Sequence, residues 1–442
     1  MQASRFNKTV DLENGSKLLF NATTGAIAEL PPDMYSPIRR LIELPDSAQT
    51  AEDKEQVDHL HYGGFLVEKE PGELTQLKVE YGDQRFGGSI FTLGIVPTLE
   101  CNLACSYCAG RKNPGRMTRH VEKALLQWAA RYIRKADETR ITWYGGEPLL
   151  CVDTIERIQQ GFAEMASGYK ATLAGSTILT NGYLLSGDMA RRLKSAGVMS
   201  AQVTLDGSLE KHDSCRPDSD GKPTFDRIID NICEAAKDLD VVVRVNVHDG
   251  DMTTAREAVE MLDQKDILSK VGFYFGEATG GCEVCSDVTG RCRLSESHAQ
   301  AQLAIYRALA SNTNCRMDFP YLTPGSRCGS TRSNSFQVAP SGYLFKCQHQ
   351  VSPRVDSSVG SIFSDQVEDF QQSNQWVFAR HDPLGSSKCL ECDILPVCMG
   401  GCPREAKKEH NEIQYKCSPL KDIMGELLVL RYLYEVGEEV TS

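Results

Sequence analysis

Three cysteines lie within one eight-residue stretch, at Cys101, Cys105 and Cys108. A structural zinc site normally uses four ligands in paired knuckles, whereas three thiolates leave a fourth metal position open. Thiolates are also the usual ligands of iron–sulfur clusters. Three protein ligands on a four-iron cluster leave one iron free to bind a small molecule, and the aromatic Tyr107 adds a wall beside it. The spacing therefore favours an iron–sulfur site with one open iron.

The other cysteines are unevenly distributed. The chain has 17 cysteines in 442 residues, none before Cys101 and eleven from Cys282 to Cys417. The N-terminal sequence has no apolar run behind a basic region, so we expect no secretory signal and a cytoplasmic protein. In a large chain of this kind, clustered cysteines indicate metal binding or catalysis rather than disulfides.

The amino-acid composition excludes several classes of protein. Hydrophobic residues make up 41% and charged residues 24% of the chain, which excludes collagen-like and mostly disordered proteins. The length predicts two to four domains. No segment approaches the roughly 18 unbroken apolar residues of a membrane span. The net charge of -12 disfavours binding to a phosphate backbone. We therefore expect neither a nucleic acid nor a membrane as partner.

A regular alternation of strands and helices must position the cysteine loop. Helical spacing predicts helices over 121–133, 189–197, 224–236 and 254–264, and a last one over 422–436. Strands are predicted over 91–98, 140–146, 176–182, 200–207, 241–247 and 270–276. Six strand–helix units predict an α/β fold. In this fold, right-handed crossovers curl a parallel sheet into a partial (β/α)6 TIM-like barrel. The segments CNLACSYC, GGEP, TNG and LDG all follow strands, where such folds place their working loops.

The three-cysteine loop, with an aromatic residue before its last cysteine, resembles that of radical S-adenosylmethionine (SAM) enzymes. Gly145-Gly146-Glu147-Pro148 resembles their GGEP motif, whose backbone and acid hold the methionine amino group, and the resemblance covers about residues 90–310. It implies that a [4Fe–4S] cluster on the loop cleaves SAM to methionine and a 5′-deoxyadenosyl radical. ILTNG, VTLDG and HDSCR resemble further parts of the family's SAM site. The residues that the resemblance assigns to SAM are Tyr107, Gly145, Gly146, Glu147, Pro148, Thr180, Asn181, Thr204, Asp206 and Arg216.

Some of these assignments have a plain alternative. Thr180, Thr204, Asp206 and Arg216 could equally be polar residues that cap strand ends. The cysteine loop and GGEP, taken together, have no comparable alternative.

The C-terminal cysteines resemble those of the SPASM domain, which carries two auxiliary [4Fe–4S] clusters. The resemblance gives the outer cluster to Cys389, Cys392, Cys398 and Cys417, and the inner cluster to Cys328, Cys347 and Cys402. Cys315 is the candidate fourth ligand of the inner cluster. Without it, an open iron could take a substrate thiolate; with it, the cluster would only pass electrons. Zinc binding is the alternative for these cysteines.

Six cysteines depart from this pattern. Cys282, Cys285 and Cys292 follow the sixth strand and could form a zinc site, a third auxiliary cluster or a substrate contact, or remain free thiols. Cys151, Cys215 and Cys233 stand alone, and the helical patterns around Cys151 and Cys233 favour thiols that pack as small hydrophobic groups.

The N-terminal region has no cysteine. Asn14-Gly15 between two strand-like runs predicts a hairpin, helices are predicted over 34–44 and 51–62, and a strand over 65–70. This order suits a winged-helix-like α+β module, or an arbitrary α+β cap. We expect a peptide-recognition (RRE-like) module over 1–88, the radical SAM barrel over 89–311 and a loop-rich iron–sulfur (SPASM) domain over 312–442.

The resemblance implies a maturase of ribosomally made (RiPP) precursor peptides. The N-terminal module resembles leader-binding domains of thioether-forming members, so a Cys sulfur-to-carbon crosslink is the leading hypothesis. Carbon–carbon or carbon–oxygen crosslinking, epimerisation and anaerobic sulfatase maturation are alternatives, and a non-enzymatic zinc protein is the competitor from another class. The expected cofactors are SAM and three [4Fe–4S] clusters. The expected partners are a precursor peptide with a leader and an electron donor such as flavodoxin or ferredoxin.

Overall fold

A computed structural model describes most of the chain. The described residues are 1–108, 115–247, 252–277, 300, 303–304, 306–307, 316–317, 322, 328–351, 357–364, 376–404, 406–409, 412–418 and 420–437. Cys282, Cys285, Cys292 and Cys315, for which ligand roles were considered, lie outside these residues.

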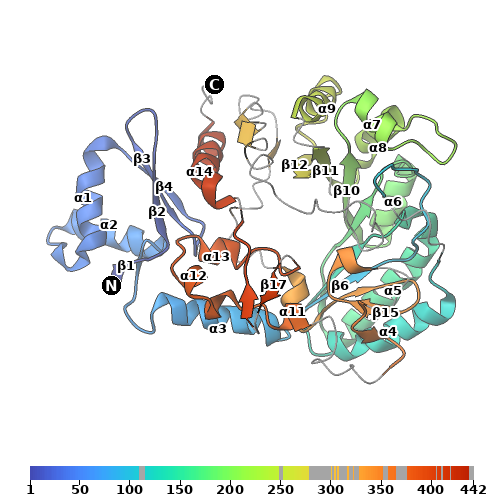
Figure 1. The fold of residues 1–442 in the computed structure, drawn as a ribbon, viewed down its shortest axis with the longest axis horizontal. Coiled ribbons are helices and arrows are strands. Elements are labelled where there is room, and N and C mark those ends of the chain that lie inside the picture. Colours follow the sequence, from blue (N-terminus) through green and yellow to red (C-terminus); the bar gives the residue numbers. More distant parts are fainter. Residues whose placement is uncertain are drawn as a thin grey trace.

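The predicted α/β unit is present. Its central strands are all parallel and follow the order of the chain: β6 (Ile90–Ile95), β7 (Glu138–Trp143), β9 (Ser176–Thr180), β10 (Val198–Leu205), β11 (Asp240–Val247) and β12 (Gly272–Glu277). The predicted helices between them are α4 (Arg119–Ile133), α6 (Gly187–Ser195), α8 (Phe225–Ala235) and α9 (Met252–Gln264). Two further helices, α5 (Val152–Tyr169) and α7 (Leu209–Cys215), were not predicted. Figure 1 shows the helices outside the curved sheet.

The two faces of this sheet differ in character. Every second side chain, such as Trp143, Val203 and Val245, is buried in a core shared with the helices. Side chains between them, such as Thr204 and Arg244, point to the opposite side, because successive residues of a strand face opposite ways. We call this second side the inner face.

The sheet does not stop at the expected domain boundary at 311/312. β14 (Ser335–Val338) pairs in parallel with β6, and β15 (Tyr343–Phe345) and β16 (Gly360–Ser361) continue antiparallel. A short β13 (Arg316–Met317) pairs with β12 at the other edge. The C-terminal region was expected to be loop-rich, but its first strands extend the central sheet, which fixes this region against β6.

The rest of the C-terminal region consists of short elements and one long helix. The short helices are α11 (Trp376–Ala379), α12 (Ser387–Leu390) and α13 (Leu395–Cys398), and β17 (Lys407–Glu409) pairs with β18 (Glu412–Gln414). The predicted last helix is α14 (Leu420–Val436). None of the helices within the described ranges is long and apolar enough to cross a membrane.

The N-terminal region contains the predicted hairpin. β2 (Asn7–Asp11) and β3 (Lys17–Asn21) are antiparallel, and Gly15 in the turn has φ +84°, which favours glycine. β4 (Ile27–Leu30) adds a third strand that was not predicted. The predicted helices are α1 (Pro32–Glu43) and α2 (Ala51–Tyr62).

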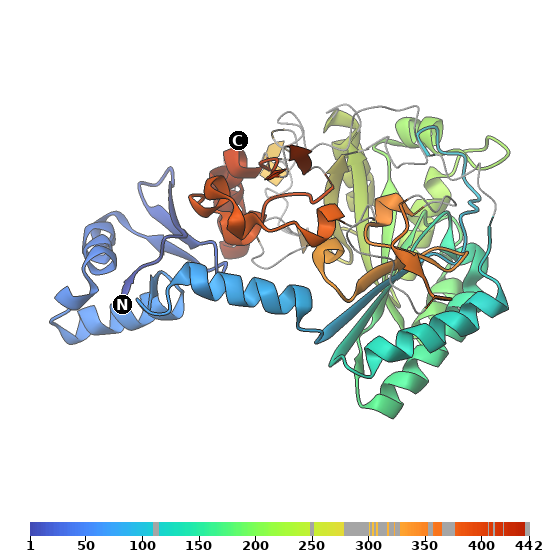
Figure 2. The same cartoon turned by 60° about the horizontal axis from the view of Figure 1, so that its bottom comes forward.

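The expected strand over 65–70 is shorter than predicted. Only β5 (Leu66–Val67) forms, and it pairs with β1 (Gln2–Ala3). Helix α3 (Glu73–Phe86), which was not predicted, then leads to the central sheet, and Figure 2 shows it spanning from the N-terminal module to that sheet.

Contacts fix the N-terminal module to the C-terminal region. α14 packs against β2 and β3, and the Tyr432 hydroxyl donates to Glu29 Oε2 at 2.5 Å. Lys8 pairs with Asp393 at 3.1 Å. On α3, the Tyr81 hydroxyl donates to the His381 carbonyl at 2.8 Å. The module is therefore attached to the region that holds the later cysteines.

Candidate active site

The cysteine loop follows β6 and is held along its length by a second segment. Ala104 N–H donates to the Pro217 carbonyl at 2.7 Å, and Ser106 N–H donates to the Cys215 carbonyl at 2.9 Å. The carbonyl of Asn102 accepts from Ser219 N–H at 3.1 Å. The segment after α7 thus supports the loop by backbone contacts. Cys215, for which no role was expected, supplies one of these contacts through its carbonyl.

The thiols of this loop lie in a partly dehydrated environment. Cys101 and Cys105 are half-buried and Cys108 is exposed. Burial raises the pKa of the Cys105 thiol to about 12, and the nearby Arg216 guanidinium opposes that rise. The thiols of Cys101 and Cys108 are close enough to raise the pKa of Cys105 further. Three neighbouring thiols that become thiolates on binding iron fit the chemistry of a cluster, since metal ligands must be deprotonated.

The GGEP segment is bonded directly onto the chain that leads to the cysteine loop. Gly146 N–H donates to the Thr98 carbonyl at 3.0 Å, and Glu147 N–H donates to the Glu100 carbonyl at 2.7 Å. A Cβ on Gly146 would lie 2.1 Å from the Glu100 oxygen, so a side chain there would push the segments apart. Gly145 has φ +139° and a similar close approach to the Thr98 oxygen. Pro148 is buried at the start of the following 3-10 helix.

Glu147 connects the ends of β7 and β9. Its carboxylate is fully buried and accepts from the Thr180 hydroxyl at 2.8 Å, Asn181 N–H at 2.8 Å and Leu149 N–H at 3.0 Å. Burial raises the pKa of Glu147, and the hydrogen bonds from Asn181, Leu149 and Thr180 oppose the rise. A carboxylate has about four lone-pair sites, so one on Oε2 remains for a further donor.

Asn181 links this group to the cysteine loop. Its Nδ2 donates to Cys101 Sγ at 3.6 Å and to Asn102 Oδ1 at 2.9 Å. Thr180, Asn181 and Glu147, which the family resemblance assigned to SAM, are thus brought together beside Cys101. They bond to one another and to the loop, and also accept hydrogen bonds from the backbone of Leu149, Gly182 and Tyr183.

A second chain of polar side chains crosses the inner face. Arg216 Nη1 donates to the Tyr107 hydroxyl at 2.7 Å and lies 3.7 Å from Asp206 Oδ1. Asp206 Oδ1 also accepts from Asn246 Nδ2 at 2.7 Å, and Asn246 Oδ1 accepts from Arg244 Nε at 2.9 Å. The chain of contacts begins at Tyr107, next to Cys108, and ends on β11. It brings together Tyr107, Asp206 and Arg216.

Sequence reasoning missed Asn246 and Arg244. They occupy alternate positions of the otherwise apolar strand VVVRVNV, and this polar alternation was the available signal. Thr204 pairs in register with Arg244 on the neighbouring strand. Within the described part of the chain, its side chain enters none of the hydrogen bonds of these two groups.

His212 supports the same region and was not predicted. Its Nδ1 accepts from Asp206 N–H at 3.2 Å, and its Nε2 faces the Thr224 hydroxyl at 3.2 Å. The Thr224 hydroxyl donates to the Arg216 carbonyl at 2.8 Å. Burial lowers the pKa of His212 to about 4, with the Arg216 charge acting in the same direction. The neutral ring therefore fixes the backbone that carries Asp206 and Arg216.

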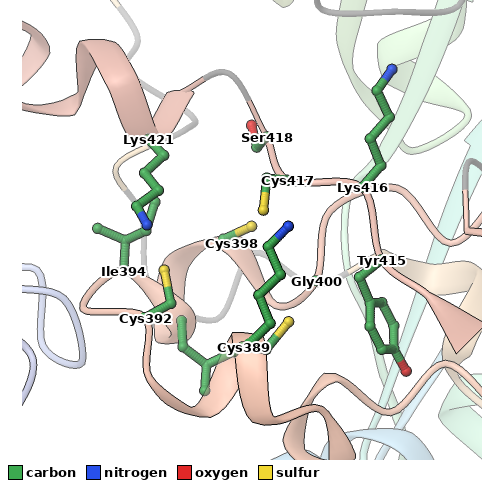
Figure 3. A pocket seen from close by; sticks show the side chains of 12 residues that line it. Cys389, Cys392, Ile394, Cys398, Gly400, Tyr415, Lys416, Cys417, Ser418 and Lys421 are labelled. Atoms are coloured by element: carbon green, nitrogen blue, oxygen red, sulfur yellow. The ribbon is translucent and has the colours of Figure 1, made fainter.

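The four cysteines expected to hold the outer cluster line one cavity. Figure 3 shows the sulfur atoms of Cys389, Cys392, Cys398 and Cys417 around it, with Lys421 at its side. They come from α12, the turn after it, α13 and the strand-to-helix connection before α14. Burial raises the pKa of Cys389 and Cys398, and the neighbouring thiols contribute to the same shift.

The three cysteines expected around the inner cluster also lie near one another. Burial raises the pKa of Cys347 to about 11, and Cys328 and Cys402 raise it further through their charges. Cys347 is half-buried, whereas Cys328 and Cys402 are exposed. Over the described ranges, no three Cys, His, Asp or Glu side chains are placed to hold a single metal ion.

The remaining described cysteines lie outside both groups. Cys215 is buried, and Cys151 and Cys233 are half-buried. Cys233 packs against the main core, as a small hydrophobic group would.

Comparison with known proteins identifies the central domain. The family model described as the radical SAM superfamily matches residues 95–263. The mycofactocin maturase MftC of Mycolicibacterium smegmatis is 23% identical over 330 residues, covering 69% of this chain and 76% of that protein. The serine-type anaerobic sulfatase-maturating enzyme of Bacteroides thetaiotaomicron is 22% identical over 360 residues, covering 69% of this chain and 80% of that protein.

Two solved structures extend the similarity in fold. The protein anSMEcpe with bound AdoMet and Cp18Cys peptide has a TM-score of 0.59 at 17% identity, over 79% of this chain and 100% of that chain. Streptococcus suis SuiB bound to its precursor peptide SuiA has a TM-score of 0.51 at 14% identity, over 91% of this chain and 95% of that chain. The family model, together with the GGEP segment bonded onto the chain that leads to the cysteine loop, shows that residues 95–263 form a radical SAM domain. The chain is a radical SAM enzyme, homologous to maturases.

Proposed function

We propose that this enzyme matures a ribosomally made precursor peptide and installs a thioether between a cysteine sulfur and a carbon atom. The observation that carries the proposal is the N-terminal module of β1–β5 and α1–α2, fixed to the C-terminal region by α14. The similarity to SuiB leaves 9% of the 442 residues uncovered, about 40, so it includes at least part of residues 1–88. SuiB is a protein solved with a precursor peptide.

The similarity to anSMEcpe covers less of this chain than the similarity to SuiB. It leaves 21% of the 442 residues uncovered, about 93, while covering all of that chain. This shortfall is close to the length of the proposed recognition module, 1–88. The similarity to the Bacteroides enzyme supports a sulfatase-maturating activity. Because anSMEcpe has no counterpart for a segment about as long as the module, this activity is the second candidate and not the first.

The module offers a place for a leader peptide. β2 and β4 are the edge strands of the three-stranded sheet. An extended peptide can add to such an edge through main-chain hydrogen bonds, while pockets for alternate side chains give specificity. We assign residues 1–88 to leader recognition, 89–311 to the radical SAM barrel and 312–442 to a SPASM domain.

The donor sets fit three [4Fe–4S] clusters. Cys101, Cys105 and Cys108 would hold the radical cluster, Cys389, Cys392, Cys398 and Cys417 the outer cluster, and Cys328, Cys347 and Cys402 the inner one. When bound, the first cluster and SAM supply a 5′-deoxyadenosyl radical that removes a hydrogen atom from an unactivated carbon. Glu147 would accept a hydrogen bond from the methionine ammonium through its remaining lone pair. Arg216 and Asp206 would fix the wall of the SAM site through Tyr107.

The bonds that break and form in the proposed reaction determine which products an experiment should find. A carbon–hydrogen bond and a sulfur–hydrogen bond break, and a carbon–sulfur bond forms. One hydrogen atom leaves with 5′-deoxyadenosine, and the thiol proton leaves to solvent. The remaining electron leaves the peptide for an acceptor, the role proposed for the auxiliary clusters.

The experiment uses the reconstituted enzyme, SAM, a reductant and a synthetic peptide encoded by a short cysteine-rich open reading frame beside the gene. A thioether removes two hydrogen atoms from the peptide and makes one cysteine inert to iodoacetamide. A carbon–carbon or carbon–oxygen crosslink removes the same mass but leaves every cysteine alkylated. Epimerisation leaves the mass unchanged in water and adds one deuterium in heavy water. Mass spectrometry therefore separates these outcomes, and an unmodified peptide would contradict the proposal.

A further inference from the structure

Tyr144 carries a buried hydroxyl with no hydrogen-bond partner among the described residues. It follows β7 directly and precedes Gly145 of the GGEP segment. A buried polar group without a partner costs about 1–3 kcal/mol, and buried tyrosines normally find one. The hydroxyl therefore has a hydrogen-bonding capacity that the described residues leave unused.

The Tyr144 side chain lies on the inner face of the sheet. Ile141 and Trp143 on the same strand are buried in the helix-side core, so the alternation of a strand turns Tyr144 the other way. Its ring crosses Gly94 on β6. A Cβ at Gly94 would lie 2.9 Å from Tyr144 Cε1 and 1.8 Å from Gln337 Oε1. Glycine at this position thus leaves room for both side chains on the inner face.

Two groups border the Tyr144 ring. The ring packs against the small apolar cluster of Val96, Ala339, Phe345 and Val351, which joins the end of β6 to the C-terminal hairpin. Burial raises the pKa of Tyr144 well above its usual value, and the charge of Cys347 contributes to the rise. A tyrosine hydroxyl is protonated at neutral pH and can donate, and the ring lies beside the hairpin that leads to Cys347.

We propose that the Tyr144 hydroxyl donates a hydrogen bond to a backbone carbonyl oxygen of the precursor peptide, holding the peptide between the SAM site and the inner cysteines. The inference rests on the proposed function. The peptide carbon must lie in contact with the reacting atom of SAM, because hydrogen transfer depends on close positioning. A side chain that directly precedes the SAM segment and packs on the hairpin leading to Cys347 borders that position. The competing role for the Tyr144 hydroxyl is to donate a hydrogen bond to the inner cluster.

The test compares wild-type enzyme with Tyr144→Phe, both reconstituted and given the same synthetic peptide. The substitution removes only the hydroxyl, so the ring packing should persist. We expect peptide modification, measured as kcat/KM, to fall about tenfold, the typical effect of losing one hydrogen bond to the reacting complex. We also expect more 5′-deoxyadenosine per modified peptide, because a less firmly held peptide is missed more often. Tyr132→Phe, on α4 and stacked on Phe91 at 4.9 Å, is the matched control.

The outcomes are distinguishable. Equal modification and equal coupling in Tyr144→Phe and wild type would overturn this inference alone. A changed paramagnetic resonance signal of the inner cluster without peptide, at unchanged kcat/KM, would assign the hydroxyl to the cluster and also overturn it. No modified peptide from the wild type would overturn the proposed function and this inference with it.

Discussion

At the scale of single residues, the site depends on side chains that hold the loops rather than on isolated reactive groups. Glu147 joins Thr180 to the backbone of Asn181, and Asn181 in turn contacts Cys101. The carboxylate is fully buried. A change at Glu147 should therefore affect both the shape of the site and its affinity for SAM.

Glu147→Ala tests this double role. A hydrogen bond to a charged group contributes roughly 1.5–3 kcal/mol, so we expect SAM affinity to fall by about one to two powers of ten. We also expect a lower melting temperature, because three donors lose their acceptor. Glu147→Gln is the control for shape, since it retains one acceptor oxygen. Unchanged SAM binding in the alanine variant, measured by equilibrium dialysis, would mean that Glu147 only supports the loop.

His212 gives the fold a dependence on pH. Burial holds its folded pKa at about 4, below the ordinary value of 6.5, so the unfolded chain binds a proton first as pH falls. The contribution is complete above about pH 6.5 and is lost between pH 6.5 and 4. From pH 7 to 5 the loss should be about 2 kcal/mol. Denaturant unfolding of wild type and His212→Gln checks this, and equal pH slopes in the two proteins would contradict it.

At the scale of elements, the sequence allowed prediction of what depends on local pattern. The six parallel strands and the helices α4, α6, α8 and α9 follow from apolar spacing within each segment. The short strands β4 and β14 carry little periodicity and form because a neighbour supplies hydrogen bonds. α3 and α5 were missed although both are long.

In the candidate site, too, only the features with a local sequence pattern could be predicted. The cysteine loop and GGEP were predictable from their spacing. The contact of the loop with residues 215–219, and the contacts of His212 and Asn246, join positions far apart in the chain and depend on the tertiary fold. No local pattern specifies such partners. The alternation of Arg244 and Asn246 in an apolar strand was the nearest signal.

Each cysteine group is proposed to hold its own cluster, so the loss of one group should remove the iron of that cluster alone. Three four-iron clusters give roughly twelve iron atoms and as many acid-labile sulfides per chain. Cys105→Ala should lose about four of each, since two thiolates do not hold a cluster of this kind, and the C-terminal clusters should persist. Cys151→Ala, outside every proposed ligand set, should retain all of them. Iron content unchanged in Cys105→Ala, or SAM cleavage at the wild-type rate, would contradict the assignment.

At the scale of the whole molecule, α3 and α14 place the N-terminal module against the C-terminal cysteine region. Arg85 at the end of α3 donates to the carbonyl of Thr331 at 3.3 Å, close in sequence to Cys328. Figures 1 and 2 both show α14 between the module and the barrel. A peptide bound at the module would thus remain attached to the same body that holds the radical site.

This arrangement predicts a strong effect of the leader. A precursor peptide with its leader should be modified faster than the core peptide alone, because binding at the module raises the effective concentration of the core at the barrel to about the millimolar range. The comparison uses intact enzyme at peptide concentrations well below that range. Equal rates for the two peptides would remove the recognition role of the module.

The central claim is that a radical from SAM takes a hydrogen atom from a bound peptide. The direct measurement uses precursor peptides deuterated at carbon, one residue at a time, with analysis of 5′-deoxyadenosine by mass spectrometry. We predict that deuterium appears in 5′-deoxyadenosine for one labelled position, in proportion to the peptide modified. Modified peptide accompanied only by unlabelled 5′-deoxyadenosine, at every labelled position, would contradict the account.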